Sequence, residues 1–262
     1  VIERLIHQVA KLVYPLEKLE IQILDDSTDE TTDLVQKTIQ ELPEAIQSIF
    51  VHIRRPDRRG YKAGALAYGL TQTHAEFVAI FDADFVPSKD FLLRTIPYFT
   101  ENIGVVQTRW GHLNKDYSLL TELQAFGLNG HFAIEQGGRN VSGHYINFNG
   151  TAGVWRRATI DDAGGWEHDT ITEDLDLSYR AQLNGWRFIF LNDVETPAEL
   201  PVDMDGFKSQ QHRWTKGSIQ VCKKVLPAIW RSNVPLFVKM EATAHLTSNF
   251  AYLLLICLCF LI

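Results

Sequence analysis

The chain has 262 residues, of which 45% are hydrophobic and 22% are charged, so it can bury a sizeable core in one large α/β domain or two small ones. Its formal net charge of −7 argues against a general nucleic-acid binder, because such proteins carry a positive surface for the phosphate backbone. Its three cysteines lie late in the chain, in or near apolar sequence, and indicate neither a disulfide framework nor a zinc site.

The first half of the chain alternates apolar strands with helices. Strands are predicted over residues 19–26, 48–55, 76–87 and 103–110. Between them the pattern predicts a helix over 27–42, where Ser27 and Glu30 have capping-box spacing, a helix over 58–73 after a glycine-containing turn, and a helix capped by Ser88. Strand–helix alternation with wholly apolar strands predicts a mostly parallel sheet with helices on both faces.

The second half continues the α/β pattern. In chain order it predicts a long helix, a strand, a second strand and a second long helix, over about 117–137, 145–157, 186–193 and 205–226. Gly150 and Gly153 interrupt the first of these strands. The segment VETPAELPVD, residues 194–203, is predicted to be a connector without regular structure.

Two acidic clusters follow predicted strands. Asp25 and Asp26 end the first strand, and Asp82 and Asp84 end the third. Ligands of parallel α/β sheets bind beyond the carboxyl ends of the strands, so both clusters are expected at one rim. One acidic strand end is unremarkable because Asp favours turns, whereas two beside a predicted cleft indicate a site. The carboxylates of an Asp-x-Asp sequence can hold a hard divalent cation such as Mg²⁺.

The stretch ITEDLDLSYRA places three carboxylates at the start of a predicted helix. Glu173 follows Thr170 at capping-box spacing, and acids in a first turn complement the helix dipole. Asp176 precedes Arg180 by four residues, the spacing of an ordinary exposed ion pair. Asp174 instead shares its helical face with residues that point inward, where a carboxylate needs a partner or a chemical role. Helix-end electrostatics is the structural alternative.

Two further sequences carry groups suited to a sugar nucleotide. Lys62 lies in the turn RRGYKAG near a predicted helix N-terminus, a suitable place for a phosphate, although alone it could be an ordinary surface lysine. Gln210, Arg213 and Trp214 share one helical face in QQHRW. Arginine offers bidentate contacts to phosphate and tryptophan a flat surface for a pyranose ring. Arg213 and Trp214 could instead form a membrane-interface pair.

The end of the chain is strongly apolar. Residues 250–262 form an uninterrupted apolar run of 13, short of the roughly 20 that span a bilayer. Counting back to Thr243 gives 20 residues without a formal charge, apart from His245 when it is protonated. Seven Lys or Arg and no acid lie over 206–240. We therefore expect the start of a transmembrane helix whose preceding flank is cytoplasmic; a buried C-terminal helix is the alternative.

Four motifs occur in order as DDS, DAD, TED and QQHRW. Together they resemble the family 2 processive glycosyltransferases, the group that contains cellulose synthase. The segments GYKAGAL, FNGTAGVWR and DTITEDLDLSYRAQLNGW are most similar to the cellulose-synthase-like mannan and glucomannan synthases. The resemblance covers nearly the whole chain. It implies a GT-A, Rossmann-like nucleotide-sugar-binding domain over 1–204, a membrane-interface segment over 205–240 and a truncated transmembrane helix over 241–262.

The resemblance also implies a role for each motif residue. Asp174 would be the catalytic base, and Asp82 with Asp84 would hold Mg²⁺ or Mn²⁺. The residues expected to bind the nucleotide-sugar donor are Asp25, Asp26, Lys62, Asp82, Gln210 and Arg213. The residues expected to contact the acceptor sugar are Trp214, Gly150, Thr151 and Glu173.

The implied reaction is the inverting, metal-dependent transfer of a hexose from GDP-mannose or UDP-glucose to a growing β-linked polysaccharide. The whole protein is then expected to be a multi-pass protein of the cell membrane with a cytoplasmic catalytic domain. The first strand of the fold, the N-terminal transmembrane segments and the later channel helices are expected to lie outside this sequence. Two other classes stay open: a non-processive membrane glycosyltransferase that adds one sugar to a lipid, and a non-catalytic nucleotide-sugar-binding or scaffold protein.

Overall fold

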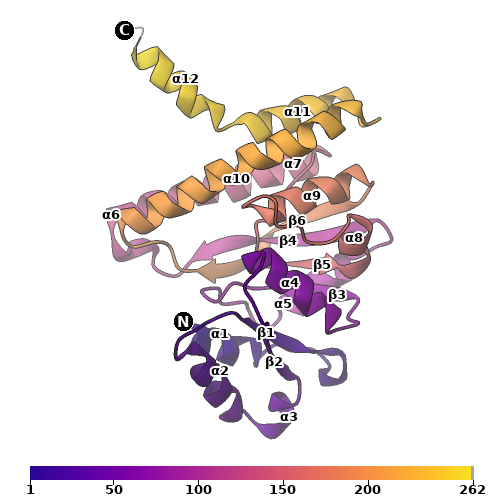
Figure 1. The fold of residues 1–262 in the computed structure, drawn as a ribbon, viewed down its shortest axis with the longest axis vertical. Helices are drawn as coiled ribbons and strands as arrows, with labels where there is room; N and C mark the ends of the chain where they lie inside the picture. Colours follow the sequence, from indigo (N-terminus) through magenta and orange to yellow (C-terminus); the bar gives the residue numbers. More distant parts are fainter. Residues whose placement is uncertain (261–262) are drawn as a thin grey trace.

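The computed structural model describes residues 1–260, which fold into an α/β domain followed by three C-terminal helices (Figure 1). The strands are β1 (Ile21–Asp25), β2 (Phe50–Arg54), β3 (Phe77–Ile80), β4 (Ile103–His112), β5 (Gly153–Arg156) and β6 (Arg187–Ala198). The α-helices of the domain are α1 (Ile2–Val9), α2 (Thr31–Gln40), α3 (Glu44–Gln47), α4 (Tyr61–Thr71), α5 (Phe91–Thr95), α6 (Leu119–Gly130), α7 (Gly137–Val141), α8 (Arg157–Asp162) and α9 (Glu173–Leu183). The C-terminal helices are α10 (Met204–Arg231), α11 (Leu236–Thr247) and α12 (Phe250–Cys259).

The strands form two sheets. β1 and β2 pair in parallel, and the larger sheet has the order β3-β5-β4-β6. Within it β4 and β6 are parallel, whereas β5 runs antiparallel to both β3 and β4. The predicted α/β fold with parallel strands is confirmed, and the reversal of β5 makes the larger sheet mixed.

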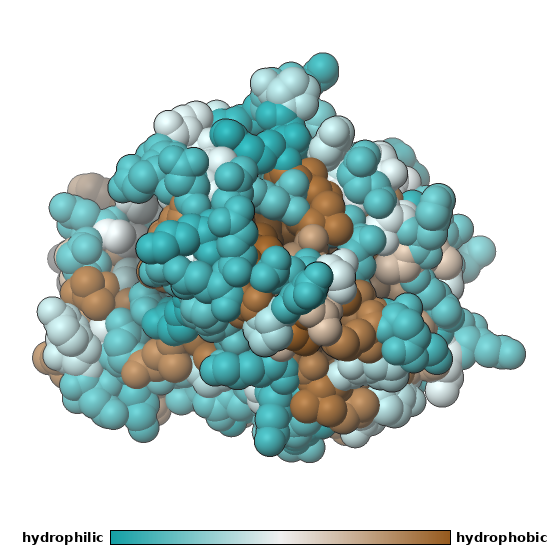
Figure 2. Space-filling view, turned by 90° about the horizontal axis from the view of Figure 1, so that it is seen from below, coloured by the Kyte–Doolittle hydropathy of each residue, from teal (hydrophilic) through white to brown (hydrophobic). Residues whose placement is uncertain are grey.

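A cavity separates the two sheets. β1 and β3 are the facing edge strands and do not pair with each other. The cavity between them has a volume of about 740 Å³ and is lined by apolar residues of both strands and of α4, with Asp26, Lys62 and Asp82 also on its wall. Figure 2 views the molecule from this N-terminal end, where apolar side chains are visible in a hollow among hydrophilic ones. The polar motif residues therefore border an apolar space.

Helices cover both faces of the larger sheet, as predicted. On one face Trp155 is fully buried and packs with its ring centroid 5.5 Å from Phe148, 5.6 Å from Trp166 and 5.4 Å from Phe188. Residues of α4, α8 and α9 complete this cluster. On the other face α5 packs against buried residues of the sheet, which are Ile103 and Val106 of β4, Val154 of β5, and Leu191 and Val194 of β6. The neighbours Val154 and Trp155 belong to opposite faces, as the two-residue side-chain period of a strand requires.

The predicted Ser27–Glu30 capping box is wrong. The Ser27 hydroxyl and backbone N–H both donate to the Asp25 carboxylate instead. As a result α2 begins later, at Thr31, with Glu30 in the N-cap position and no side-chain cap. The Ser27 hydroxyl donates to the Asp25 carboxylate because an ionised carboxylate is a strong hydrogen-bond acceptor. The hydroxyl is then not available to cap α2, as the spacing predicted.

Two other predicted caps are also wrong. α5 begins at Phe91, because Ser88 instead opens a turn in which its carbonyl accepts from the Phe91 N–H at 3.0 Å. α9 begins at Glu173, and the Thr170 hydroxyl has no hydrogen-bond partner within residues 1–260. The predicted caps thus located the helices but not their first residues.

Element lengths also differ from the predictions. β6 runs on to Ala198, so the first part of the predicted connector is strand. This is possible because β6 is an edge strand, where the missing N–H of Pro197 leaves no interior ladder bond unmade. In contrast, only Gly153–Arg156 of the predicted strand over 145–157 is strand, and the preceding residues form loops. The long helix over 117–137 is confirmed and contains a π-helical segment, His131–Gln136, between α6 and α7.

The C-terminal helices lie at the end of the molecule opposite the N-terminus, and α12 extends away from the domain (Figure 1). α10 starts where Asp203 accepts a hydrogen bond from Gly206 N at 2.7 Å, and it continues through Pro227 to Arg231, five residues beyond its predicted end. Among residues 1–260, no single helix has both the length and the apolar character to cross a membrane. α11 and α12 reach that length and composition only as a pair, with a 60° bend between them. The predicted span over 241–262 stays a prediction, and residues 261–262 lie outside the described residues.

Candidate active site

Lys62 joins three of the predicted site segments. Its Nζ lies 2.5 Å from Asp82 Oδ1 and donates to the Gly150 carbonyl at 2.9 Å. A Cβ atom placed on Gly150 would lie 3.1 Å from Asp174 Oδ2 and 3.5 Å from Lys62 Nζ. The lysine, the Asp-x-Asp turn, the FNGTAG loop and the start of α9 therefore meet at one point. The absence of a side chain at Gly150 is what allows this approach.

Backbone conformation places these groups. Gly60 has φ +73°, in the left-handed region that favours glycine, and starts α4 so that Lys62 lies in its first turn. Gly150 has φ +80°, and the next turn of the loop also places the non-glycine Ala152 at φ +56°. Thr151 Oγ1 accepts a hydrogen bond from Asp82 N at 2.8 Å. The FNGTAG loop is thus fastened directly to the Asp-x-Asp turn.

Asp25 and Asp26 are held by partners from the same chain. Asp25 Oδ2 lies 2.9 Å from both His52 Nε2 and Thr32 Oγ1, and Ser27 donates to its other oxygen. Burial alone would raise the pKa of Asp25, but these hydrogen bonds outweigh it and lower the pKa to about 2. Asp26 accepts two hydrogen bonds from the guanidinium of Arg55, one of them from Nε at 2.9 Å. This end of the site is therefore rigid, and Asp25 is fully ionised at neutral pH.

The pKa values of Asp174 and Glu173 are shifted in the opposite direction to that of Asp25. Burial raises the pKa of Asp174 to about 7, and the negative charge of Glu173 adds to the effect. Burial also raises the pKa of Glu173, although the cations of Lys62 and Arg213 work in the other direction. A carboxyl group that titrates near neutral pH can accept a proton in a reaction at that pH.

The Asp-x-Asp turn has the chemistry of a site for a hard cation. Burial raises the pKa of Asp84, and the neighbouring carboxylates of Asp82 and Glu199 raise it further. Asp82, Asp84 and Glu199 supply only oxygen atoms. Their three negative charges exceed the two positive charges of Lys62 and of Arg4, which pairs with Glu199 at 2.6 Å. Oxygen ligands with excess negative charge fit Mg²⁺ or Mn²⁺.

Gln210, Arg213 and Trp214 lie on α10. Arg213 is exposed, and its positive charge acts to lower the pKa of Glu173 at the start of α9. Gln210 and Trp214 are partly buried. Within residues 1–260 the three side chains form no hydrogen bond and no ion pair. Their polar groups are therefore not engaged by other side chains of the described residues.

Sequence patterns missed the polar side chains that support the FNGTAG loop. Gln107, fully buried on β4, accepts from Asn149 N at 3.0 Å and donates to the Ala152 carbonyl at 3.0 Å. Gln136 in the π-helical segment donates to Asn149 Oδ1 at 2.8 Å. A glutamine inside the apolar run GVVQTRW was the one available signal, because a buried amide must find partners.

Asp176 forms the predicted ion pair, but the prediction that this pair is exposed is wrong. The ion pair with Arg180 exists, with Nη2 2.8 Å from Oδ2, but the Asp176 side chain is 0% exposed rather than on the surface. Lys224 of α10 is a second partner, 3.0 Å from Oδ1. Helical spacing identified the pair and could not show that another helix covers it.

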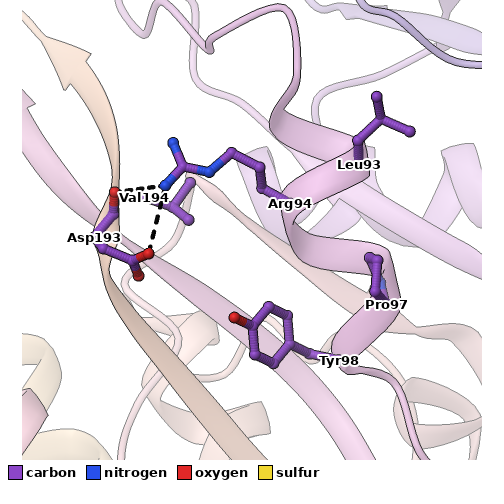
Figure 3. Close-up of a pocket in the computed structure, with 6 residues that line it drawn as sticks. All are labelled: Leu93, Arg94, Pro97, Tyr98, Asp193 and Val194. Carbon is purple, nitrogen blue, oxygen red and sulfur yellow. Dashed lines mark hydrogen bonds and ion pairs between the residues drawn. The ribbon is translucent and has the colours of Figure 1, made fainter.

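A second cavity lies away from these residues. It has a volume of about 310 Å³ and is lined by Leu93, Arg94, Pro97, Tyr98, Asp193 and Val194 (Figure 3). Arg94 points to Asp193 and donates to its carbonyl at 2.8 Å, so its charge is already engaged. None of the predicted site residues lines this cavity.

Comparison with known proteins gives one family. A family model described as "Glycosyltransferase like family 2" matches residues 1–217. The chain is 44% identical over 224 residues to "Probable glucomannan 4-beta-mannosyltransferase 4" of Oryza sativa subsp. japonica, covering 83% of this chain and 41% of that protein. It is 45% identical to the same plant's "Probable glucomannan 4-beta-mannosyltransferase 11", covering 83% of this chain and 39% of that protein. The chain thus spans about two fifths of these relatives' length.

Solved structures share the fold. A mannosyltransferase, PcManGT from Pyrobaculum calidifontis, in complex with GDP-Man and Mn²⁺, has a TM-score of 0.70 at 22% identity, over 95% of this chain and 66% of that one. Residues 1–349 of S. aureus TarS, in complex with UDP-GlcNAc, give 0.66 at 17% identity, over 95% and 68%. These likenesses confirm the GT-A fold. Because the family match covers most of the sequence, the chain belongs to glycosyltransferase family 2.

Proposed function

We propose that this chain is the catalytic part of a β-glycan synthase that transfers a hexose from GDP-mannose or UDP-glucose to a growing polysaccharide. One observation carries the proposal: Lys62 contacts both Asp82 and the Gly150 carbonyl, beside the Asp174 carboxylate. A leaving diphosphate and an incoming hydroxyl need a cation and a base within one substrate's reach, and this arrangement supplies both. The names of the plant relatives and the GDP-Man in a structural neighbour support mannose as the first sugar to test.

Transfer then proceeds by a single displacement. Asp174 accepts the proton of an acceptor hydroxyl, whose oxygen attacks the anomeric carbon of the donor. The bond from that carbon to the diphosphate oxygen breaks, and the departing negative charge faces Lys62 and Arg213. One attack from the face opposite the leaving group inverts the anomeric centre, so an α-linked donor gives a β-glycoside.

Asp82 and Asp84 would hold the divalent cation. When bound, Mg²⁺ or Mn²⁺ supplies positive charge to the diphosphate as it leaves. Asp25 and Asp26 would bind the nucleoside end. Asp26 lines the cavity, and the hydrogen bonds of Asp25 to Ser27, Thr32 and His52 would hold this strand end in place against the nucleoside. Gln210 would assist with the pyrophosphate.

The acceptor sugar would lie on the other side of the base. Trp214 offers a flat apolar surface for a pyranose ring, and Glu173 offers a hydrogen-bond acceptor at the same entrance. Gly150 and Thr151 would line this side through their backbone. The arrangement lets the sugar hydroxyl reach Asp174 while the ring stacks on the indole.

Membrane attachment is part of the proposal. The basic residues of 206–240, the exposed apolar side chains of α12 and a need for cytosolic nucleotide sugars support a cytoplasmic domain whose C-terminal side lies at a bilayer. Membranes containing the full-length protein should retain it after washes with high salt and carbonate. Release into the soluble fraction would contradict this attachment.

The activity is tested with membranes of the full-length protein and a panel of labelled nucleotide sugars. We expect label in a long insoluble polymer with β-linkages when the correct donor is supplied. Label in a single glycolipid would identify a non-processive transferase instead. Donor binding without any transfer would contradict the proposed activity.

A further inference from the structure

Four residues of α10 form one stripe that follows the entrance of α9. Arg213, Gly217, Gln220 and Lys224 recur at i, i+4, i+7 and i+11, so they lie on the same face of the helix. Arg213 begins this stripe, and its positive charge acts to lower the pKa of Glu173. The position of Arg213 along the site therefore depends on how the rest of the stripe is held.

The middle of the stripe is in close contact with the segment just before α9. A Cβ atom on Gly217 would lie 2.3 Å from Thr172 Cγ2, so only glycine allows this approach. Gln220 Oε1 accepts a hydrogen bond from Ile171 N at 2.9 Å. Both contacts are to residues immediately before Glu173. Both therefore fix the position of α10 along the axis of α9, that is, its register.

Lys224 ends the stripe in a cluster of three carboxylates. Its Nζ lies 2.7 Å from Asp169 Oδ1 and 3.0 Å from Asp176 Oδ1, and it also donates to Glu167. Asp176 is 0% exposed and is two residues from Asp174 on α9. The ammonium of α10 is thus joined to the base-bearing helix and to the loop before it.

We propose that Lys224 is a positioning residue, which fixes the register of α10 against α9 so that Arg213 faces the leaving diphosphate. The inference rests on the proposed function, since it assigns Lys224 an effect on that reaction. The nearest atoms of Lys224 are carboxylates remote from the Asp-x-Asp turn, so it acts through the helix rather than on the substrate.

Apolar packing alone does not set this register. Leu175 and Tyr179 of α9 pack with Val221, Val225 and Ile229 of α10, which holds the helices together. Hydrophobic contact is non-directional, and one turn of slippage along a helix is about 5.4 Å, enough to remove an arginine from its phosphate. The ion pair of Lys224 with Asp176 depends on the register, because one turn of slippage would separate Nζ from a fully buried carboxylate. A buried ion pair is weak evidence for stability, so we assign this one to the register of the two helices.

The test uses the purified full-length protein in detergent, with Lys224→Met, the conservative Lys224→Arg, and Lys223→Met as a matched control. Lys223 is the adjacent exposed lysine and forms no ion pair within residues 1–260. We expect Lys224→Met to lower kcat about tenfold or more while the Kd for the nucleoside diphosphate changes by about threefold or less, because a misplaced Arg213 fails chiefly on the charge that develops during transfer. Lys224→Arg should recover most of the loss, and Lys223→Met should match the wild type.

The decisive readout is a double-mutant cycle with Arg213→Met. If Lys224 acts through Arg213, adding Lys224→Met to Arg213→Met lowers kcat by no more than about twofold further. If the loss of kcat in the double variant equals the product of the losses in the two single variants, the inference is overturned. A wild-type kcat in Lys224→Met would also overturn it. If Lys224→Met does not fold, Gln220→Ala from the same stripe takes its place in the cycle with the same expectation. Absence of transfer by the wild-type protein overturns the proposed function and this inference together, whereas transfer with multiplying losses overturns this inference alone.

Discussion

The two acidic ends of the site differ in what surrounds them. At the β1 end Asp25 is buried among hydrogen-bond donors, and its pKa falls to about 2 although burial opposes the shift. At the α9 end Asp174 is buried beside another carboxylate, and burial raises its pKa to about 7. Burial acts in the same direction at both, so the donors decide the outcome. The β1 end therefore holds a fixed anion, and the α9 end holds a carboxyl group that takes up or releases a proton near neutral pH.

The two carboxyl groups also contribute to stability with opposite signs. Asp25 has a folded pKa below its unfolded value, so its contribution is present above about pH 4 and is lost as pH falls toward 2. Asp174 has a folded pKa above its unfolded value, so its contribution is present below about pH 4 and is lost as pH rises through 7. The fold thus bears a cost at neutral pH for keeping Asp174 able to accept a proton.

Removing the base should have the largest effect. Asp174→Asn keeps the shape of the side chain and removes its basicity, so we expect transfer to fall on the order of a hundredfold or more. The affinity for the nucleotide-sugar donor should stay near the wild-type value, as measured by calorimetry. Asp116→Asn, a substitution at an exposed aspartate away from the site, is the matched control. Near wild-type turnover in Asp174→Asn would mean that Asp174 is structural.

Removing one carboxylate of the Asp-x-Asp turn should be next in size. Asp84→Ala takes away an oxygen ligand, so affinity for the nucleoside diphosphate in Mn²⁺ should fall about tenfold or more. In excess chelator the wild type and the variant should bind with the same reduced affinity. Full wild-type activity in chelator would rule out the metal role.

The pH dependence of the wild type should report the α9 end. Because Asp174 must lose its proton before it can accept one, kcat/KM should rise with pH and level off above an apparent pKa near 7, falling about tenfold per pH unit below it. The charge of Lys62 lowers the pKa of Asp174, so Lys62→Met should move the midpoint to higher pH. A profile that is flat between pH 5 and 8 would contradict this assignment.

Stability should show the smallest effect and the opposite signs. At pH 8, Asp174→Asn should raise Tm, because a neutral amide removes the cost of a buried charge, whereas Asp25→Asn should lower Tm, because it weakens the hydrogen bonds at β1. Each kcal/mol corresponds to roughly 2–4 °C for a domain of this size. Scanning calorimetry of both variants checks the pair. Shifts of the same sign would remove the contrast between the two ends.

The sequence singled out three residues that the structure places together, but not the side chains that support them. Lys62 contacts Asp82, and Asp174 and Lys62 both approach Gly150. These residues occur at strand ends and helix starts, which hydrophobic periodicity locates. The capping role assigned to Ser27 failed because its hydroxyl had a stronger competitor two residues away. Local sequence spacing shows which hydrogen-bond partners a side chain can reach, but not which of them it binds.

Contacts between distant elements were beyond local patterns. The burial of Asp176 depends on Lys224, 48 residues later in the chain, and nothing in the α9 sequence indicates that α10 covers it. The course of β6 through Pro197 depends on its place at the edge of a sheet. Register and coverage are properties of the assembled fold, so they emerge only when the elements are packed.

The protonation state of Asp174 tests the central claim most directly. Difference infrared spectroscopy of the full-length protein can follow the carboxylic acid band that the wild type has and Asp174→Asn lacks. We predict that this band is present at pH 5 and disappears as the pH rises, with a midpoint near 7, as expected for a buried proton acceptor. An Asp174 carboxyl that is already ionised at pH 5 would contradict the account.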